Sequence, residues 1–355
     1  MSSFDKRSPR LSVVMSVFNG GRLLGEAIDS VLAQTMPDFE FVIVNDGSTD
    51  STLRTLEIYA KRDGRIKVIN QANTGLTMAL KRAVAASTGP LIARMDADDL
   101  SSPDRFERQI SLLDLKPHLV AVSCGIENIG PNLVPLGIVK NRYDCTTLPL
   151  LLAFSNVISG HGQMMIRRVA YETVAGYDSR FRYSQDYDLW CRLLKVGPIE
   201  EVDGVLYRFR IGHNSISTRN GDNQRALAVG IAANQYRYIS GSVPKIEQVQ
   251  DAMDWWLPQS FAYRSTWRQI MVDRHIRFAV RKYIQSNSLS SSSLIPFYNH
   301  LAQILVSAHD SVPKNQVFKR AILKMLIVRW IPRRSFGTLL VKLGLAPVAP
   351  GLGIR

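Results

Sequence analysis

The sequence predicts an α/β protein in which a mostly parallel sheet is flanked by helices and followed by a helical C-terminal region. Two observations support this fold class. Through the first hundred residues, short apolar runs alternate with segments of helical periodicity, which is the pattern of parallel β-α-β units. The charge then changes along the chain: residues 1–215 carry 25 Lys and Arg against 24 Asp and Glu, whereas residues 216–355 carry 19 against 6. We therefore expect an α/β domain over residues 1–217 and a basic helical region over residues 218–355.

Four apolar segments are the expected strands of the parallel half of the sheet. They cover residues 11–18, 39–44, 66–69 and 90–95. Between them, apolar side chains recur at the spacing of one helix face, so a helix is expected after each of the first three strands. Asp50 or Ser51 can cap the second of these helices.

Further along the chain the pattern is less regular. Three more features are expected: strands with turns over residues 120–139, a strand entering a short helix over residues 161–168, and a strand over residues 205–209. A helix is expected to begin at Gln185, with Tyr187 and Trp190 on its buried side.

Polar residues follow each of the first four strands. They are Asn19, Asp46, Asn73 and the acidic run Asp96–Asp99. Because the carboxyl ends of parallel strands meet at one edge of a sheet, and ligands bind beyond that edge, these side chains are expected to share one site.

The acidic run places three carboxylates, Asp96, Asp98 and Asp99, within four residues at the end of a buried strand. Like charges repel and burial adds to the cost, so such a cluster needs a partner. Carboxylate oxygens suit Mg²⁺ or Mn²⁺, which bind through one or two carboxylates together with substrate phosphates. The alternative is an acidic turn in which Asp99 or a neighbour caps the helix after Pro103.

Composition excludes several classes of protein. A hydrophobic content of 46% and a charged content of 21% in 355 residues are those of a globular protein. Three widely spaced cysteines match no zinc pattern and favour reduced thiols in the cytoplasm. No apolar run is long enough for a signal peptide or a membrane span.

Two common nucleotide-binding motifs are missing. No Gly-x-Gly-x-x-Gly follows the first strand, and no Gly-x-x-x-x-Gly-Lys-Ser/Thr occurs. A pocket with acidic walls cannot neutralise phosphates through its side chains, so a metal ion would have to do so. Asp46 suits the hydrogen-bond donors of a base or ribose, and Phe18 offers an apolar surface to a base.

Two later segments add candidates to the site. Asp186 lies where a helix begins, where it is either a functional carboxylate or a simple helix cap. The segment 210–217 follows a strand with basic and hydroxyl side chains, which suit a diphosphate or a metal.

The order of these motifs resembles that of the GT-A glycosyltransferases of family 2, which are inverting enzymes that use nucleotide sugars. The matching segments are residues 13–19, 44–50, 73–75, 94–99, 161–162, 185–190 and 210–217. Each motif is weak alone, but seven in the right order are specific. Two positions depart from the usual pattern: Phe18 stands where a tyrosine is common, and Gln185 where a glutamate is common.

The resemblance implies a role for each matching residue. Asp186 is expected to be the general base, and Asp98 and His213 are expected to hold Mn²⁺ or Mg²⁺; a lone histidine at a strand end is as readily a surface residue. The residues expected to bind the donor are Ser16, Phe18, Asn19, Asp46, Asn73, Gly75, Arg94, Asp96 and Arg210. Those expected to bind the acceptor are His161, Gln185 and Trp190.

The C-terminal region supplies the net positive charge. Residues 317–334 mix basic residues with Trp330, Leu and Ile at helical spacing. This pattern is typical of an interfacial helix on an anionic membrane, or equally of a packing helix with a basic rim. No nucleic-acid motif accompanies the charge, so nucleic acid is not an expected partner. A cytoplasmic protein is expected, peripheral to the inner face of the membrane if the helix binds lipid.

Three functions compete. The first is an inverting, metal-dependent glycosyltransferase that moves a sugar, expected from a UDP-sugar, to a saccharide or lipid-linked acceptor in surface polysaccharide or glycolipid synthesis. The second is a sugar nucleotidyltransferase, which would normally carry a basic, glycine-rich loop after the first strand. The third is a catalytically silent module that binds nucleotide sugars; retention of four functional aspartates, Asp46, Asp96, Asp98 and Asp186, argues against it.

Overall fold

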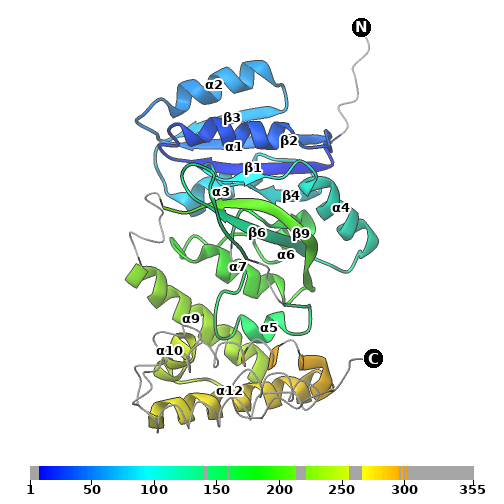
Figure 1. Ribbon diagram of the computed structural model, residues 1–355, viewed down its shortest axis with the longest axis vertical. Coiled ribbons are helices and arrows are strands. Elements are labelled where there is room, and N and C mark those ends of the chain that lie inside the picture. Colours follow the sequence, from blue (N-terminus) through cyan, green and yellow to red (C-terminus); the bar gives the residue numbers. More distant parts are fainter. Residues whose placement is uncertain are drawn as a thin grey trace, which may run out of the picture. The chain divides into compact units, whose positions relative to one another are not determined.

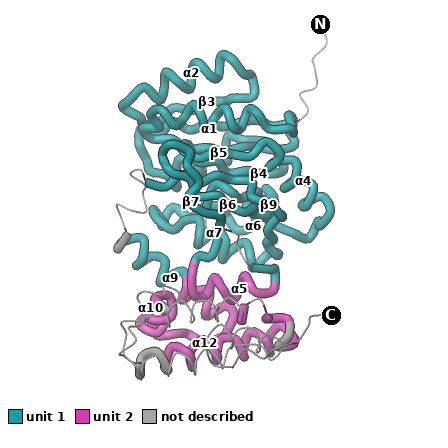
Figure 2. Tube along the Cα trace, viewed as in Figure 1, with its two compact units in different colours: residues 1–145, 156–231 teal, residues 146–155, 232–355 magenta. Residues whose placement is uncertain are grey.

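The structure is a computed structural model, and it describes residues 8–139, 143–158, 160–212, 221–255, 266–295, 297–298 and 301. The chain forms two compact units (Figure 2). The first comprises residues 1–145 and 156–231, and the second comprises residues 146–155 and 232–355. The expected boundary at residue 217 falls outside the described residues and stays a prediction.

Four parallel strands form one half of the sheet in the first unit, as expected (Figure 1). They are β1 (Leu11–Val17), β2 (Phe39–Asp46), β3 (Ile66–Gln71) and β4 (Leu91–Arg94), in the order β3-β2-β1-β4. Both β2 and β4 flank β1, with Leu11 paired to Phe39 on one side and to Leu91 on the other. The intervening helices are α1 (Leu23–Leu32), α2 (Thr52–Arg62) and α3 (Leu76–Ala85).

The sheet continues beyond β4 with mixed strand directions. The added strands are β8 (Met165–Arg167), β6 (Ala121–Ile129), β9 (Ile199–Arg210), β5 (Leu100–Ser101) and, paired with β6, the edge strand β7 (Pro135–Val139). β8 is antiparallel to β4 and β6, whereas β9 is parallel to β6. Three helices complete this half: α4 (Arg105–Leu115), α6 (Arg168–Thr173) and α7 (Gln185–Leu193).

Strand β9 is longer than expected. The sequence predicts a strand over residues 205–209, yet β9 begins at Ile199. Its pairing with β6 shifts register near Gly125, opposite Gly204, whose φ of +113° favours glycine. The acidic residues before this irregularity hide the strand from an apolar-run criterion.

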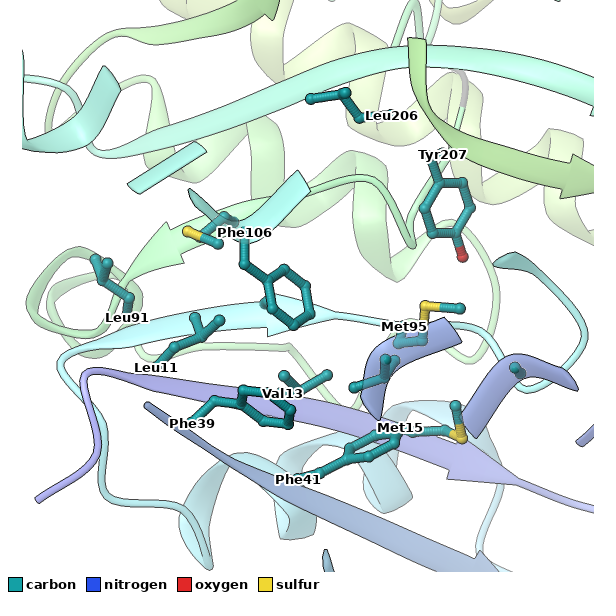
Figure 3. Close-up of a cluster of buried hydrophobic side chains, with 14 of the residues drawn as sticks. Leu11, Val13, Met15, Phe39, Phe41, Leu91, Met95, Phe106, Leu206 and Tyr207 are labelled. Carbon is teal, nitrogen blue, oxygen red and sulfur yellow. The ribbon is translucent and has the colours of Figure 1, made fainter. Parts of the chain in front are cut away.

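The main core packs the apolar side of β1, β2 and β4 against α1, α4 and β9 (Figure 3). Phe39 and Phe106 meet edge to face with ring centroids 5.8 Å apart. Tyr207 enters this core from β9, with its hydroxyl directed toward Met95, the first residue after β4 (Figure 3). The core therefore reaches the acidic run and fixes the backbone from which it extends.

The described residues of the second unit are helical, as expected. Its helices include α5 (Leu148–Leu151), α10 (Ile246–Trp255), α12 (Thr266–Ser286), the 3₁₀ turn η1 (Ser291–Leu294) and the later part of α9 (Gly221–Ser240). The Tyr236 and His275 rings stack with centroids 4.3 Å apart. Among the described helices, none has the length and apolar character needed to cross a bilayer. The basic segment 317–334 lies outside the described residues.

Candidate active site

The acidic run forms a turn, which we call the acid turn (residues 95–99), between β4 and β5. Arg94 ends β4 and is 2% exposed, and its Nη2 forms an ion pair of 2.5 Å with Oδ1 of Asp96. The side chains of Asp96 and Asp98 are partly exposed, whereas Asp99 is buried. The turn thus keeps two carboxylates partly exposed and one buried within the protein.

Asp99 does not cap the helix after Pro103. Helix α4 begins at Arg105, and Asp104 occupies its N-cap position without a side-chain cap bond. The Oδ1 of Asp99 instead accepts a hydrogen bond of 2.8 Å from the backbone N–H of Arg210. The capping alternative is therefore wrong for Asp99, because the carboxylate ties the acid turn to the end of β9.

The side chain of Arg210 holds the same turn in addition to its backbone N–H. Its Nε donates to the carbonyl of Asp98 at 2.8 Å, its Nη1 to the carbonyl of Pro131 at 3.0 Å, and its Nη2 pairs with Glu26 at 2.8 Å. The side chain is 1% exposed. Every guanidinium nitrogen is thus engaged within the protein, and contact of Arg210 with a diphosphate stays a prediction.

The electrostatics of the acid turn favour a cation. Burial and the neighbouring charges of Asp96 and Asp98 raise the pKa of Asp99 well above its ordinary value. Burial, partly offset by the cation of Arg94, likewise raises the pKa of Asp96. No group of three or more His, Cys, Asp or Glu side chains in the described part of the chain is arranged to hold a metal alone. The partly exposed carboxylates of Asp96 and Asp98 nevertheless fit a Mg²⁺ or Mn²⁺ ion that takes its other ligands from phosphate and water.

Asp46 organises the loop after β3. Its buried carboxylate accepts hydrogen bonds from Nε2 of Gln71 at 2.7 Å and from the backbone N–H groups of Thr74 and Gly75, each at 2.9 Å. Gly75 has a φ of +87°, which brings its N–H to the carboxylate. The structure therefore brings Asp46 and Gly75 together, and contact with a base or ribose stays a prediction.

The loop after β1 contains an exposed ring beside a structural asparagine. Phe18 is 52% exposed, so its ring is accessible for stacking. Asn19 adopts a positive φ of +52°; its Oδ1 accepts from the backbone N–H of Thr49 at 2.8 Å. Ser16 lies partly exposed on β1, and Asn73 is exposed after β3. Asn19 thus joins the loops that follow β1 and β2, a function that its position in the sequence does not reveal.

Asp186 lies in the first turn of α7, after Ser184, which has a φ of +55°. Its Oδ2 accepts a hydrogen bond of 3.2 Å from Nδ2 of Asn156. Burial raises the pKa of Asp186, hydrogen bonds from Tyr187 and Asn156 oppose the shift, and the negative charge of Asp96 adds to it. A carboxyl with a raised pKa is suited to take up a proton.

Three aromatic side chains gather near the start of α7. Nε2 of His161 lies 2.6 Å from the hydroxyl oxygen of Tyr177, and the His161 ring meets Trp190 edge to face at 5.9 Å. Burial and the cation of Arg94 hold the pKa of His161 well below its ordinary value, so the imidazole is neutral. The predicted acceptor residues His161 and Trp190 are thus brought together, with Gln185 buried at the start of the same helix.

Sequence reasoning missed several residues of this region. Asn156 holds Asp186, Tyr177 contacts His161, and the hydroxyl of Tyr207 accepts from the backbone N–H of Asp96 at 3.2 Å. None stands in a chemically distinctive motif, although the pair Gly176-Tyr177 before the Asp186 motif is a usable signal. His213 lies outside the described residues, and its role stays a prediction.

Comparisons with known proteins place the chain in a family. The family model described as "Glycosyl transferase family 2" matches residues 12–175. An uncharacterized glycosyltransferase of Haemophilus influenzae is 30% identical over 246 residues, an alignment that covers 66% of this chain and 76% of that protein.

Solved structures show the same fold at low sequence identity. Residues 1–349 of TarS from S. aureus, solved with UDP-GlcNAc, superpose with a TM-score of 0.55 at 15% identity, covering 93% of this chain and 92% of that one. The mannosyltransferase PcManGT from Pyrobaculum calidifontis, solved with GDP-Man and Mn²⁺, gives a TM-score of 0.50 at 17% identity, covering 91% and 87%. The sheet of the first unit therefore has the GT-A fold, and the chain is an enzyme that belongs to glycosyltransferase family 2.

Proposed function

We propose that this enzyme is an inverting, metal-dependent glycosyltransferase that moves a sugar from a UDP-sugar to a hydroxyl group of a saccharide or lipid-linked acceptor. The observation that carries the proposal is that the carboxylates of the acid turn and the separate carboxylate of Asp186 belong to one site. The acid turn has partly exposed carboxylates that could face a donor. The turn at His161 and Gly162 links it to the helix of Asp186: a Cβ at Gly162 would lie 2.9 Å from Oδ2 of Asp96, and the His161 ring meets Trp190 on α7. This arrangement suits a single displacement in which the acid turn serves the departing diphosphate and Asp186 serves as the base.

The donor half of the site uses the carboxyl ends of β1, β2 and β4. Phe18 would stack on the base, and Asp46 would hold the ribose or base through the loop that it orders. Asp98, with His213, would hold Mn²⁺ or Mg²⁺; when bound, the ion supplies Lewis-acid stabilisation of the charge on the departing diphosphate. Asp96, fixed by Arg94, would face the ribose or the sugar.

The acceptor half centres on Asp186. In the proposed reaction its carboxylate removes the proton from the acceptor hydroxyl as that oxygen attacks the anomeric carbon. The bond from that carbon to the diphosphate oxygen breaks in the same displacement, and the nucleoside diphosphate leaves with the electron pair. One displacement inverts the anomeric configuration. His161, Gln185 and Trp190 would hold the acceptor sugar.

The structural neighbours support the donor class. TarS was solved with UDP-GlcNAc and PcManGT with GDP-Man and Mn²⁺. We propose a UDP-sugar as the donor and a GDP-sugar as the alternative that the first assay must include. The silent-module and nucleotidyltransferase alternatives are disfavoured by membership of a glycosyltransferase family.

We also propose that the enzyme works at the cytoplasmic face of a membrane. The support is the sequence alone: the basic residues among 317–334 match an anionic surface, where a lipid-linked acceptor for surface polysaccharide or glycolipid synthesis would be found.

The proposed function is tested by calorimetry with UDP and Mn²⁺. We expect binding by the wild type and its loss in Asp98→Ala and after addition of a chelator. Equal UDP affinity with and without metal would refute metal dependence, and it would leave family membership untouched.

A further inference from the structure

Arg105, at the start of α4, is a buried cation that has no carboxylate partner among the described residues. Its exposure is 0%, and within the described part of the chain no carboxylate forms an ion pair with it. The two neighbouring buried arginines are both paired, Arg94 with Asp96 and Arg210 with Glu26. An unpaired charge is costly to bury, so Arg105 depends on the hydrogen bonds that it makes within the core.

One of these bonds holds the backbone at the end of β4, where the acid turn begins. Nη2 of Arg105 donates to the carbonyl oxygen of Arg94 at 3.0 Å, at the last residue of β4. Its guanidinium also lies over the ring of Tyr207, with Cζ 5.1 Å from the centroid. The hydroxyl of that tyrosine accepts from the backbone N–H of Asp96, the second residue after Arg94. Arg105 therefore supports the acid turn indirectly, through the carbonyl of Arg94 and through the ring of Tyr207.

A second chain of bonds leads to the turn that contains His161. Nε of Arg105 donates to Oε1 of Gln109 at 3.0 Å, and Nε2 of Gln109 donates to the carbonyl of Gln163 at 2.8 Å. Both glutamines are fully buried. A Cβ at Gly162 would overlap the hydroxyl oxygen of Tyr207, so this turn packs directly against the tyrosine on which Arg105 stacks.

We propose that Arg105 is a positioning residue for the donor site, which fixes the acid turn relative to the 161–164 turn before substrate binds. The inference rests on the proposed function, because it assumes that the acid turn holds the metal and the donor. Arg105 is fully buried, so it would act through the Arg94 carbonyl, Tyr207 and Gln109 and not by contact with a substrate. The guanidinium suits this role because its planar fork donates in several fixed directions, which a lysine cannot reproduce.

The test compares two arginines that bond to opposite ends of β4, the fully buried Arg105 and the partly buried Arg168. Arg168 donates to the carbonyl of Gly89, just before β4, at 2.6 Å and to Ser87 at 2.8 Å, away from the acid turn. Arg105→Lys, Arg105→Met and the control Arg168→Lys are purified, and their melting temperatures and affinities for UDP and GDP with Mn²⁺ are measured. A role confined to stability predicts that Arg105→Lys and Arg168→Lys behave alike in both measurements.

We expect both Arg105 variants to bind the nucleotide with Mn²⁺ at least tenfold more weakly than the wild type, and Arg168→Lys to stay within twofold. Unchanged affinity in folded Arg105→Lys would overturn the proposal. If the Arg105 variants do not fold, Gln109→Met decides: it cuts the connection to Gln163, and it should weaken affinity several-fold, whereas wild-type affinity would overturn the proposal. If the wild type binds neither nucleotide, the proposed function fails, and the assignment of Arg105 falls with it.

Discussion

The amide nitrogen of Asn156 donates a hydrogen bond of 3.2 Å to Oδ2 of Asp186, while the amide oxygen of the same side chain is buried without a hydrogen-bond partner among the described residues. Asn156 thus fixes one oxygen of the proposed base. The bond favours the ionised carboxylate, whereas burial favours the protonated form. Burial is the larger effect, so the pKa of Asp186 is raised.

Replacing Asn156 with alanine should move the pH dependence of transfer. The acidic limb of kcat/KM reports ionisation of the base in the free enzyme. Since burial already raises the pKa of Asp186, that limb should lie above the ordinary aspartate value of about 3.9. Loss of the Asn156 donor raises the pKa further, so the limb should shift to higher pH in Asn156→Ala. Asn70→Ala is the control, because the amide oxygen of Asn70 accepts a hydrogen bond from Asn45 on β2. Equal shifts in both variants would mean that the acidic limb reports a group other than Asp186.

Asp186→Asn should separate catalysis from stability. Removing a general base typically costs about 10²–10⁴-fold in rate, with UDP affinity nearly unchanged because the base faces the acceptor. The folded protein binds the Asp186 proton more tightly than the unfolded chain does. Stability from this group is therefore present at low pH and is lost as pH rises from the ordinary value through the raised pKa.

The neutral amide of Asp186→Asn avoids that loss, so the melting temperature at pH 7 should be unchanged or higher. If Asp186 were only a helix cap, its loss would instead lower stability by about 1 kcal/mol and leave activity largely intact. A melting curve and a rate measured on the same preparation distinguish these outcomes.

Gly162→Ala should destabilise the protein. The added methyl group would overlap Tyr207, which is buried in the core, so the turn or the ring must move. Such overpacking typically costs about 1–3 kcal/mol, and here it should also weaken binding of nucleotide with Mn²⁺, because Tyr207 supports Asp96. Gly230→Ala is the matched control: Gly230 lies inside α9, and an added Cβ would meet open space, so the substitution should raise stability by about 0.5–1 kcal/mol. Chemical denaturation of both variants gives the comparison.

Neutralising the basic C-terminal segment should weaken membrane attachment. Each Lys or Arg near an anionic surface contributes on the order of 1 kcal/mol, so replacing Lys319, Arg320, Lys324 and Arg333 with Gln should remove most of the attraction. Co-sedimentation with anionic and with neutral vesicles measures it. Attachment that ignores lipid charge, or that survives all four substitutions, would favour the packing-helix interpretation.

Much of the parallel half of the sheet was predictable from sequence. The runs that became β1, β2 and β4 are apolar because both faces of these strands are covered, so periodicity and length identify them. β9 was predicted too short, because its first half carries acidic residues and an irregular pairing at Gly204. Such strands are defined by their partners, which local sequence does not specify.

The candidate site was predicted in its charged residues and missed in their supports. Asp96 and Asp98 stand out because three carboxylates crowd the end of an apolar strand, and Asp186 stands out because it falls within the ordered series of motifs. Arg105 and Asn156 do not, since a single arginine or asparagine has many structural uses. For Arg210 the sequence predicts contact with a diphosphate, and it does not reveal that the guanidinium bonds to Asp98, Pro131 and Glu26.

Release of nucleoside diphosphate from UDP- and GDP-sugars without an acceptor tests the central claim most directly, because slow donor hydrolysis requires only the donor half of the site and the metal. We expect release with Mn²⁺ from at least one UDP-sugar, its loss on chelation, and its loss in Asp98→Ala with the melting temperature preserved. Hydrolysis that continues unchanged after chelation and in Asp98→Ala would contradict it.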